Sequence, residues 1–162
     1  MTGIAIALGA GILALLFALI LVIRVLKASQ GSEEMQSIAK AVQEGALAFL
    51  RREYIALAAF VAVVTIVLVA IPDIDYRTGI AYVVGALISA STGFLGMLVA
   101  TRANVRTTAA AARGLNAALQ VAFSSGAVMG LMVVGLGLVG VSVLYMVFGA
   151  IEDPAPEAVA AS

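Results

Sequence analysis

Three arginines are the residues of this chain best suited to binding a charged group. Arg102, Arg106 and Arg113 lie within the segment 100–114, and in a helix of roughly 100° per residue they fall within about 40° of one another. Guanidinium groups on one face can bind an anion, or they can pair with acidic groups of another segment. The three arginines are therefore candidates for anion contacts or coupling contacts on the cytoplasmic side. They can equally hold a loop on one side of a membrane and touch anionic lipid. The spacing leaves both interpretations open, and we favour structural pairing for Arg102 and Arg106.

Catalytic chemistry has few candidate residues in this sequence. The chain has no Cys and no His, which excludes thiolate metal sites, cysteine catalysis and an imidazole base. It also contains no glycine-rich phosphate loop of the P-loop type. Four carboxylates that could bind Mg²⁺ lie on the side of the membrane where the three arginines are predicted: Glu33, Glu34, Glu44 and Glu53. They belong to one helical stretch, where charged side chains also serve to keep the helix surface solvated. We therefore predict no catalytic, cofactor-binding or metal-binding residue in this chain.

The composition is that of a membrane protein. Of the 162 residues, 64% are hydrophobic and only 11% are charged, far from the balance of a soluble domain. Nine Lys and Arg balance nine Asp and Glu, so the basic excess of a nucleic-acid-binding protein is missing. The charges leave four uncharged runs, each long enough for a membrane-spanning helix of about 20 residues. We predict an all-α membrane protein with spans near 3–25, 54–72, 78–101 and 122–149.

The first and the fourth run each have an alternative interpretation. A secretory signal begins with basic residues, but here Arg24 and Lys27 follow the first run and none precedes it, which favours a retained span. The fourth run is long and its first third is polar, which favours one helix that starts at the headgroup region. A re-entrant pair of helices remains the alternative for the fourth run.

Lys and Arg are distributed unequally between the two sides of the membrane. Eight of the nine lie in or next to the segments 26–53 and 102–116, whereas Arg77 lies on the other side. Basic residues concentrate in cytoplasmic loops, so these two segments are predicted to be cytoplasmic. Both chain ends and the tail at 150–162 are then external. We expect an integral protein of a bacterial or archaeal inner membrane.

The segment before the second span has the pattern of an amphipathic helix. Ser32 is a candidate N-cap, and Glu33 and Glu34 follow it at the positive end of the helix dipole. Apolar residues then recur at the spacing of one helical face. No turn signal precedes the second span, so we predict one continuous helix with a long cytoplasmic extension. The polar face of this helix mixes acidic and basic residues, whereas a helix that lies on lipid has a mainly basic polar face. This favours packing of the apolar face against protein.

Small residues recur every four positions inside the spans. Gly85, Ser89 and Gly93 form one such series, and Gly126 and Gly130 form another. Small residues at this spacing let helix backbones approach closely in lipid, so we predict that these five residues pack helices. A lining for substrate or ion is the alternative, and little supports it.

Four strings resemble the membrane-bound, ion-translocating inorganic pyrophosphatases. They are QEGALAFLRREY at 43–54, SASTGFLGM at 89–97, ATRANVRTTAAAAR at 100–113 and AFSSGAVMGLMVVGLGLVG at 122–140. The combination of ATRANVRT with GAVMGLMVVGLGL is specific, whereas each string alone is weaker. The tight match covers about a third of the chain, and Phe94 stands where the family often has Tyr.

The resemblance implies more than the residues show. Members of that family are homodimers with an inner and an outer ring of spans, and this chain resembles their N-terminal portion, in the outer ring. They hydrolyse magnesium pyrophosphate and move H⁺ or Na⁺, so Mg²⁺ is implied for the full-length protein and none for this fragment. The implied partners are membrane lipid, the remaining spans and a second subunit; pyrophosphate binds only through the missing part. The family's Asp-Val-Gly-Ala-Asp-Leu-Val-Gly-Lys signature does not occur here, so no catalytic residue is carried over.

Two hypotheses follow. In the first, the chain is the N-terminal part of a pyrophosphate-energised H⁺ or Na⁺ pump, and the fragment alone is inactive. In the second, it is a complete four-span protein, either a transporter or a non-catalytic assembly partner. A transporter would be expected to carry an ionisable residue within its spans, and the four uncharged runs have none. The nucleotide sequence downstream of Ser162 discriminates between the two.

Overall fold

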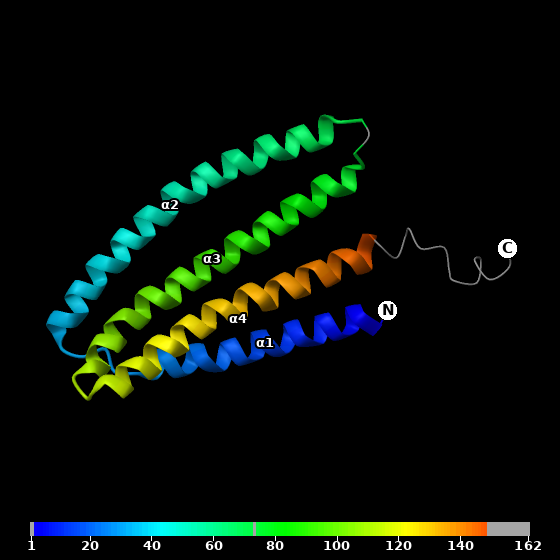
Figure 1. Cartoon of the computed structure of the whole chain (residues 1–162). Helices are drawn as coiled ribbons and strands as arrows, with labels where there is room; N and C mark the ends of the chain where they lie inside the picture. The colour runs from blue at the N-terminus through cyan, green and yellow to red at the C-terminus, as the bar shows by residue number, and fades with distance from the viewer. Residues whose placement is uncertain (1, 73, 149–162) are drawn as a thin grey trace.

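The computed structural model describes residues 2–72 and 74–148, which form four long α-helices (Figure 1). The helices are α1 (Thr2–Lys27), α2 (Glu33–Ala70), α3 (Tyr76–Ala111) and α4 (Leu115–Phe148). These described residues include no strand, and all four helices are long and apolar enough to cross a membrane. The predicted all-α, four-helix membrane fold is therefore confirmed. The tail predicted at 150–162 lies outside the described residues.

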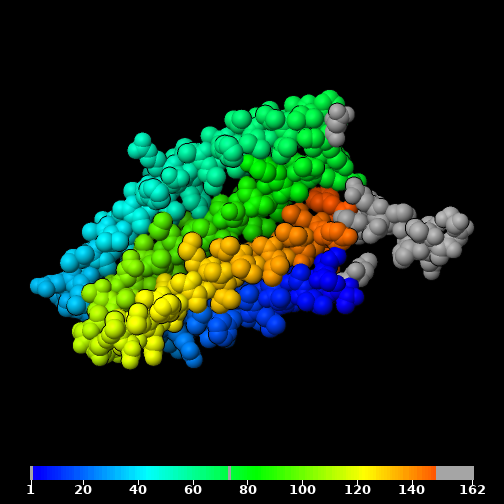
Figure 2. Space-filling model, in the orientation of Figure 1, coloured from blue at the N-terminus to red at the C-terminus, as the bar shows by residue number. Residues whose placement is uncertain are grey.

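The four helices lie side by side in one layer, in the order α2, α3, α4, α1, and neighbours run antiparallel (Figures 1 and 2). Helix α4 packs between α3 and α1, α1 also touches α3 at a few residues, and α2 contacts only α3. The α1–α2 and α3–α4 connections lie at the same end of the layer (Figure 1). We call it the arginine end, because Arg24, Arg106 and Arg113 lie near it. The N-terminus of α1 and the α2–α3 connection lie at the other end.

Local sequence signals explain where the helices begin and end. The Ser32 hydroxyl accepts a hydrogen bond from the Met35 amide at 3.3 Å, which confirms the predicted N-cap of α2. Asp75 caps α3 in the same way through the Arg77 amide. The turn before α2 places Gly31 at φ 77°, and the turn before α4 places Gly114 at φ 124°. Both values favour glycine, since they belong to a backbone region that other residues rarely adopt.

The core is small and lies where three helices meet. Leu21 of α1, Val99 of α3 and Val128 of α4 form the buried cluster. In α2 the only buried residue is Leu50, so most of this helix exposes its apolar side chains. Such exposure is costly in water but not in lipid, where the hydrocarbon is as apolar as the side chains. The exposed apolar side chains of these helices suit surroundings of hydrocarbon or of other apolar helices.

Close backbone contact holds α1 against α4. A Cβ atom added at Gly11 would lie 3.0 Å from the carbonyl oxygen of Gly135, and one added at Gly135 would lie 2.8 Å from Cγ of Leu15. Neither glycine can gain a side chain without a shift, because one neighbour is backbone and the other belongs to a packed side chain. These two glycines therefore set the distance between the helices.

Replacing Gly11 by alanine should destabilise the α1–α4 pair by about 1–3 kcal/mol, the usual cost of overpacking. Gly9→Ala is the matched control, because nothing lies within 4 Å of a Cβ there and both substitutions raise helix propensity equally. Thermal unfolding of the protein in detergent measures the difference. Equal melting temperatures for the two variants would contradict the close contact at Gly11.

Candidate functional site

The three arginines do not share one helical stripe. Helix α3 ends at Ala111, so Arg113 lies in the turn that leads to α4. There its amide donates a hydrogen bond to the Ala110 carbonyl at 2.9 Å. The expected single stripe is therefore wrong for Arg113, because this residue lies two positions beyond the last residue of α3. Arg102 is exposed and Arg106 is buried, so the two that do lie on α3 differ in environment.

Arg106 ties α3 to the end of α1. Its side chain is only 7% exposed; Nη1 donates to the Arg102 carbonyl at 2.6 Å and Nη2 donates to the Leu26 carbonyl at 3.3 Å. The last carbonyls of a helix have no partner within the helix, and together they carry a partial negative charge. Leu26 lies in the last turn of α1. The guanidinium thus caps the C-terminal end of α1 from a neighbouring helix.

The charge of Arg106 has no carboxylate partner within the described residues. Helices α1, α3 and α4 contain no Asp or Glu, and the Nε atom of Arg106 is buried without a hydrogen-bond partner there. Burial, together with the positive charge of Arg102, lowers the pKa of the Arg106 guanidinium from its ordinary value. The C-terminal carbonyls of α1 are therefore the compensating negative charge for this side chain. An anion or coupling contact at Arg102 and Arg113 stays a prediction.

The small residues predicted to pack helices lie in different surroundings. A Cβ at Gly93 would lie 3.6 Å from the Tyr54 hydroxyl, an ordinary contact between α3 and α2. At Gly85, Gly126 and Gly130 nothing in the described part of the chain lies within 4 Å of such an atom. The role of these three glycines stays a prediction, and it concerns surfaces that other helices would have to cover.

A groove runs between α3 and α4 and has a volume of about 470 Å³. Gly85, Ser89 and Gly93 line it from α3, whereas Gly137 and Gly140 line it from α4. Small side chains on both walls leave this space open, so the series on α3 forms part of a groove. We call it the α3–α4 groove.

Tyr54 is a helix contact that the sequence did not reveal. Its hydroxyl donates a hydrogen bond to the Ala90 carbonyl of α3, and its ring meets Phe94 edge to face with centroids 6.3 Å apart. The sequence suggests only an aromatic side chain at the membrane interface. The residue type itself could have indicated a hydrogen bond to another helix, since a tyrosine hydroxyl in an apolar environment needs a hydrogen-bond acceptor.

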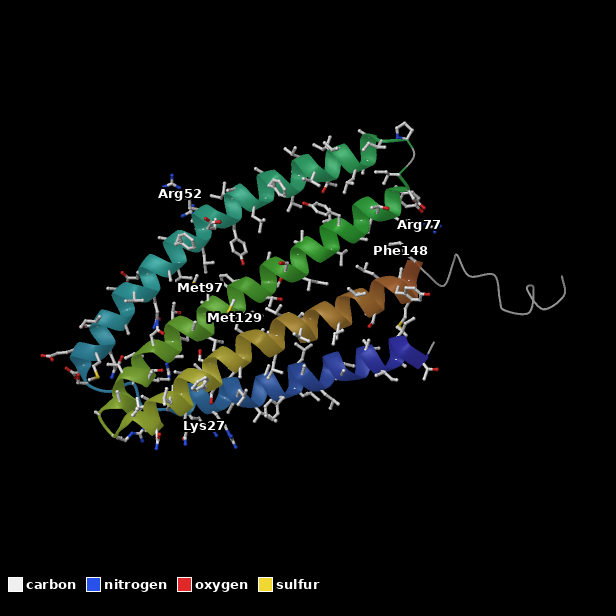
Figure 3. The ribbon with its side chains drawn as sticks, in the orientation of Figure 1. Lys27, Arg52, Arg77, Met97, Met129 and Phe148 are labelled. Carbon is white, nitrogen blue, oxygen red and sulfur yellow. The ribbon has the colours of Figure 1, made fainter. Side chains whose placement is uncertain are left out.

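Two close glycine contacts between α3 and α4 also escape the sequence pattern. A Cβ at Gly140 would lie 2.7 Å from Cδ1 of Ile88, and one at Gly96 would lie 3.1 Å from Cγ of Met129. Figure 3 places Met129 on the part of α4 that runs alongside α3. Gly135 and Gly140 are five residues apart, so a search for small residues every four positions cannot find them.

Metal binding has no suitable residue cluster within residues 2–72 and 74–148. No three side chains among His, Cys, Asp and Glu come together there in a way that could hold a metal ion. The described residues thus do not fit the Mg²⁺ that the resemblance implies for the full-length protein.

Comparison with known proteins decides the family. The family described as inorganic H⁺ pyrophosphatase matches residues 12–161, nearly the whole chain. The chain belongs to this family. Among its relatives, the K⁺-insensitive pyrophosphate-energized proton pump 2 of Moorella thermoacetica is 48% identical over 144 residues, which cover 89% of this chain and 21% of that protein.

Two further relatives extend the comparison to other pumps of the family. The K⁺-insensitive pyrophosphate-energized proton pump of Methanosarcina mazei is 38% identical over 86% of this chain. The putative K⁺-stimulated pyrophosphate-energized sodium pump of Clostridium tetani is 44% identical, also over 86% of it. These matches cover 21% and 20% of the two relatives, so the chain spans about a fifth of the length of the pumps it matches. The pyrophosphatase resemblance given by the four sequence strings is confirmed.

Replacing Arg106 by glutamine should destabilise the protein by about 1.5–3 kcal/mol, the usual worth of a hydrogen bond to a charged group. The reason is that the Leu26 carbonyl loses its donor and α1 loses the positive charge at its C-terminal end. Arg102→Gln is the matched control, because Arg102 is exposed and its hydrogen bond with Arg106 uses the backbone carbonyl, which the substitution keeps. Thermal unfolding in detergent compares them, and an equally large loss in Arg102→Gln would contradict the assigned role of Arg106.

Proposed function

We propose that this chain is the N-terminal part of an ion pump that couples the hydrolysis of inorganic pyrophosphate to the transport of H⁺ or Na⁺ across the membrane. The observation that carries the proposal is the family match over residues 12–161. The proton and sodium pumps among the relatives support it, and the choice between the two ions stays open. The chain covers only about a fifth of the length of these pumps, which supports a fragment over a complete protein.

Within this pump, the chain serves as a scaffold. It contributes four apolar helices, and the described residues contain neither a cluster suited to a metal ion nor the family's Asp- and Lys-containing signature. The catalytic residues and the Mg²⁺ ions that bind with pyrophosphate belong to the rest of the protein in this proposal. The four helices lie in an outer ring of a homodimer and contact lipid on one side and later spans on the other.

The distribution of charges supports an orientation. Five basic residues lie toward the arginine end: Arg24, Lys27, Arg102, Arg106 and Arg113. In contrast, Arg77 lies in the first turn of α3 at the other end and pairs with Asp75 at 3.5 Å. By the positive-inside rule, the arginine end faces the cytoplasm of a bacterial or archaeal cell, and both ends of the fragment are external. The part of α2 near Glu33 then extends beyond the hydrocarbon into the cytoplasm, because 38 helical residues are longer than a bilayer core requires.

Pyrophosphate-driven transport tests the pump itself. Inverted membrane vesicles that carry the whole product of this gene should hydrolyse pyrophosphate and build an H⁺ or Na⁺ gradient. Vesicles that carry residues 1–162 alone should do neither at any Mg²⁺ concentration, because this segment supplies no cluster of carboxylates for the substrate's metal ions. A fluorescent pH indicator, a sodium indicator and phosphate release measure the three activities.

Each result bears on one part of the proposal. Hydrolysis by residues 1–162 alone would overturn the scaffold role. A whole gene product that leaves pyrophosphate intact would overturn the pump.

Replacing Gly130 by leucine tests the contact with later spans. Apart from the backbone of its own helix, nothing in the described chain lies within 4 Å of a Cβ at this position, so the substitution should leave the four-helix layer intact. In the whole pump, an added leucine side chain should hinder packing of the neighbouring spans and reduce assembled protein, with substrate affinity unchanged in what survives. Size-exclusion chromatography and the Michaelis constant measure the two effects. Normal assembly with weakened substrate binding would instead place Gly130 beside the hydrolytic site.

A further inference from the structure

A second groove lies between the C-terminal end of α1 and the first third of α4, and its walls differ from those of the α3–α4 groove. Its volume is about 770 Å³, and half of its lining residues are polar or charged. Arg24 lines it from α1, and Asn116, Gln120 and Ser124 line it from α4. The three residues of α4 follow one another at intervals of four, so they form one polar stripe along the helix. We call this space the α1–α4 groove.

The charge around the α1–α4 groove is positive and has no carboxylate to balance it within the described residues. Neither α1 nor α4 contains an Asp or a Glu, and the exposed Arg24 makes no ion pair there. Lys27 follows Arg24 by about one helical turn, and Figure 3 shows it pointing away from the layer. The N-terminal end of α4 adds the partial positive charge of its dipole, and Gly114 before it has no side chain to cap it. The groove is therefore complementary to an anion.

Apolar side chains lie directly beside these polar groups. They complete the lining of the α1–α4 groove and come from both helices: Val25, Leu119, Val121 and Phe123. Phe123 is 74% exposed, and it is the direct neighbour of Ser124 on α4. On α1, Arg24 directly follows the uncharged run that ends at Ile23. Exposed apolar and polar side chains occur side by side where hydrocarbon meets headgroups, because each kind then has a favourable solvent. This contrast locates the groove at a membrane boundary.

We propose that the α1–α4 groove binds the headgroup of an anionic phospholipid. Arg24 contacts the phosphate, the amides and hydroxyl of the polar stripe bind the phosphate and the glycerol oxygens, and Leu119 and Phe123 contact the upper part of an acyl chain. Basic pockets between helices at this depth suit phosphate-bearing headgroups. The position of α1 at the edge of the layer leaves the groove accessible to lipid. The proposal concerns binding, and it does not depend on which ion is pumped.

Lipid retention by the whole protein tests the proposal. The protein is purified in detergent, exposed to equal amounts of phosphatidylglycerol and phosphatidylcholine, and the retained lipids are counted by native mass spectrometry. Wild type should prefer phosphatidylglycerol, and Arg24→Gln should reduce this preference about fivefold, the factor that one basic side chain contributes at an anionic surface. Arg24→Lys should keep most of the preference. This readout requires no hydrolysis, so its failure is distinguishable from failure of the proposed pump.

Arg52→Gln is the matched control for the loss of one positive charge. Arg52 lies on α2 at the opposite edge of the layer, where Figure 3 shows it pointing away from the other helices. Its replacement should leave the preference unchanged. An equal loss in Arg24→Gln and Arg52→Gln would overturn the site, because general charge attraction then accounts for the binding. Inorganic phosphate that displaces phosphatidylglycerol completely would overturn a site built for lipid.

A crosslinking experiment distinguishes lipid from protein as the occupant. Phe123 is replaced by the photoreactive p-benzoyl-phenylalanine, which preserves the aromatic ring, and the whole protein is irradiated in its native membrane. Crosslinks to phospholipid support the proposal. Crosslinks confined to other segments of the pump show that later spans fill the groove, and they overturn it.

Discussion

A hydrocarbon solvent is the constraint on which the rest of this structure depends. Backbone groups in a bilayer core must find hydrogen bonds within the chain, and long helices meet that requirement. Burying apolar side chains gains little there, so helix association depends on close packing and a few polar contacts. The Gly11–Gly135 approach and the Tyr54–Ala90 hydrogen bond are contacts of this kind. They connect α1 to α4 and α2 to α3, and the small core connects α1, α3 and α4.

The same solvent explains why charged side chains are missing from the long apolar stretches of the four helices. Arg106 is a charged side chain that is buried, and its surroundings show what burial requires. Its guanidinium binds the Leu26 and Arg102 carbonyls, which are neutral groups with oriented dipoles. A helix end thereby replaces the carboxylate that α1, α3 and α4 lack. The C-terminal end of α1 and the buried arginine of α3 stabilise each other, and this contact adds to the few that join α1 directly to α3.

The sequence predicts the helices well and their contacts poorly, for a physical reason. The four uncharged runs of the sequence indicate which residues lie in hydrocarbon, so four spans and the long second helix follow from composition and spacing. The Ser32 cap is predictable because capping is local. The contacts of Gly135 and Gly140 are not, since which glycines meet a neighbour depends on how two helices cross. The alanines before Arg113 favour a helix that continues through it, but α3 ends at Ala111 and the turn that follows includes Gly114 at a positive φ.

A single layer of helices leaves both of its faces open, and this property limits what the chain can do alone. An ion path must be enclosed by protein on all sides, because an ion in contact with hydrocarbon loses its hydration at great cost. Four helices in a row, with α2 in contact only with α3, enclose no such path among the described residues. In the proposed pump, later spans must therefore complete any path. The α3–α4 groove, with small residues on both walls, is one place on this layer where another helix could pack.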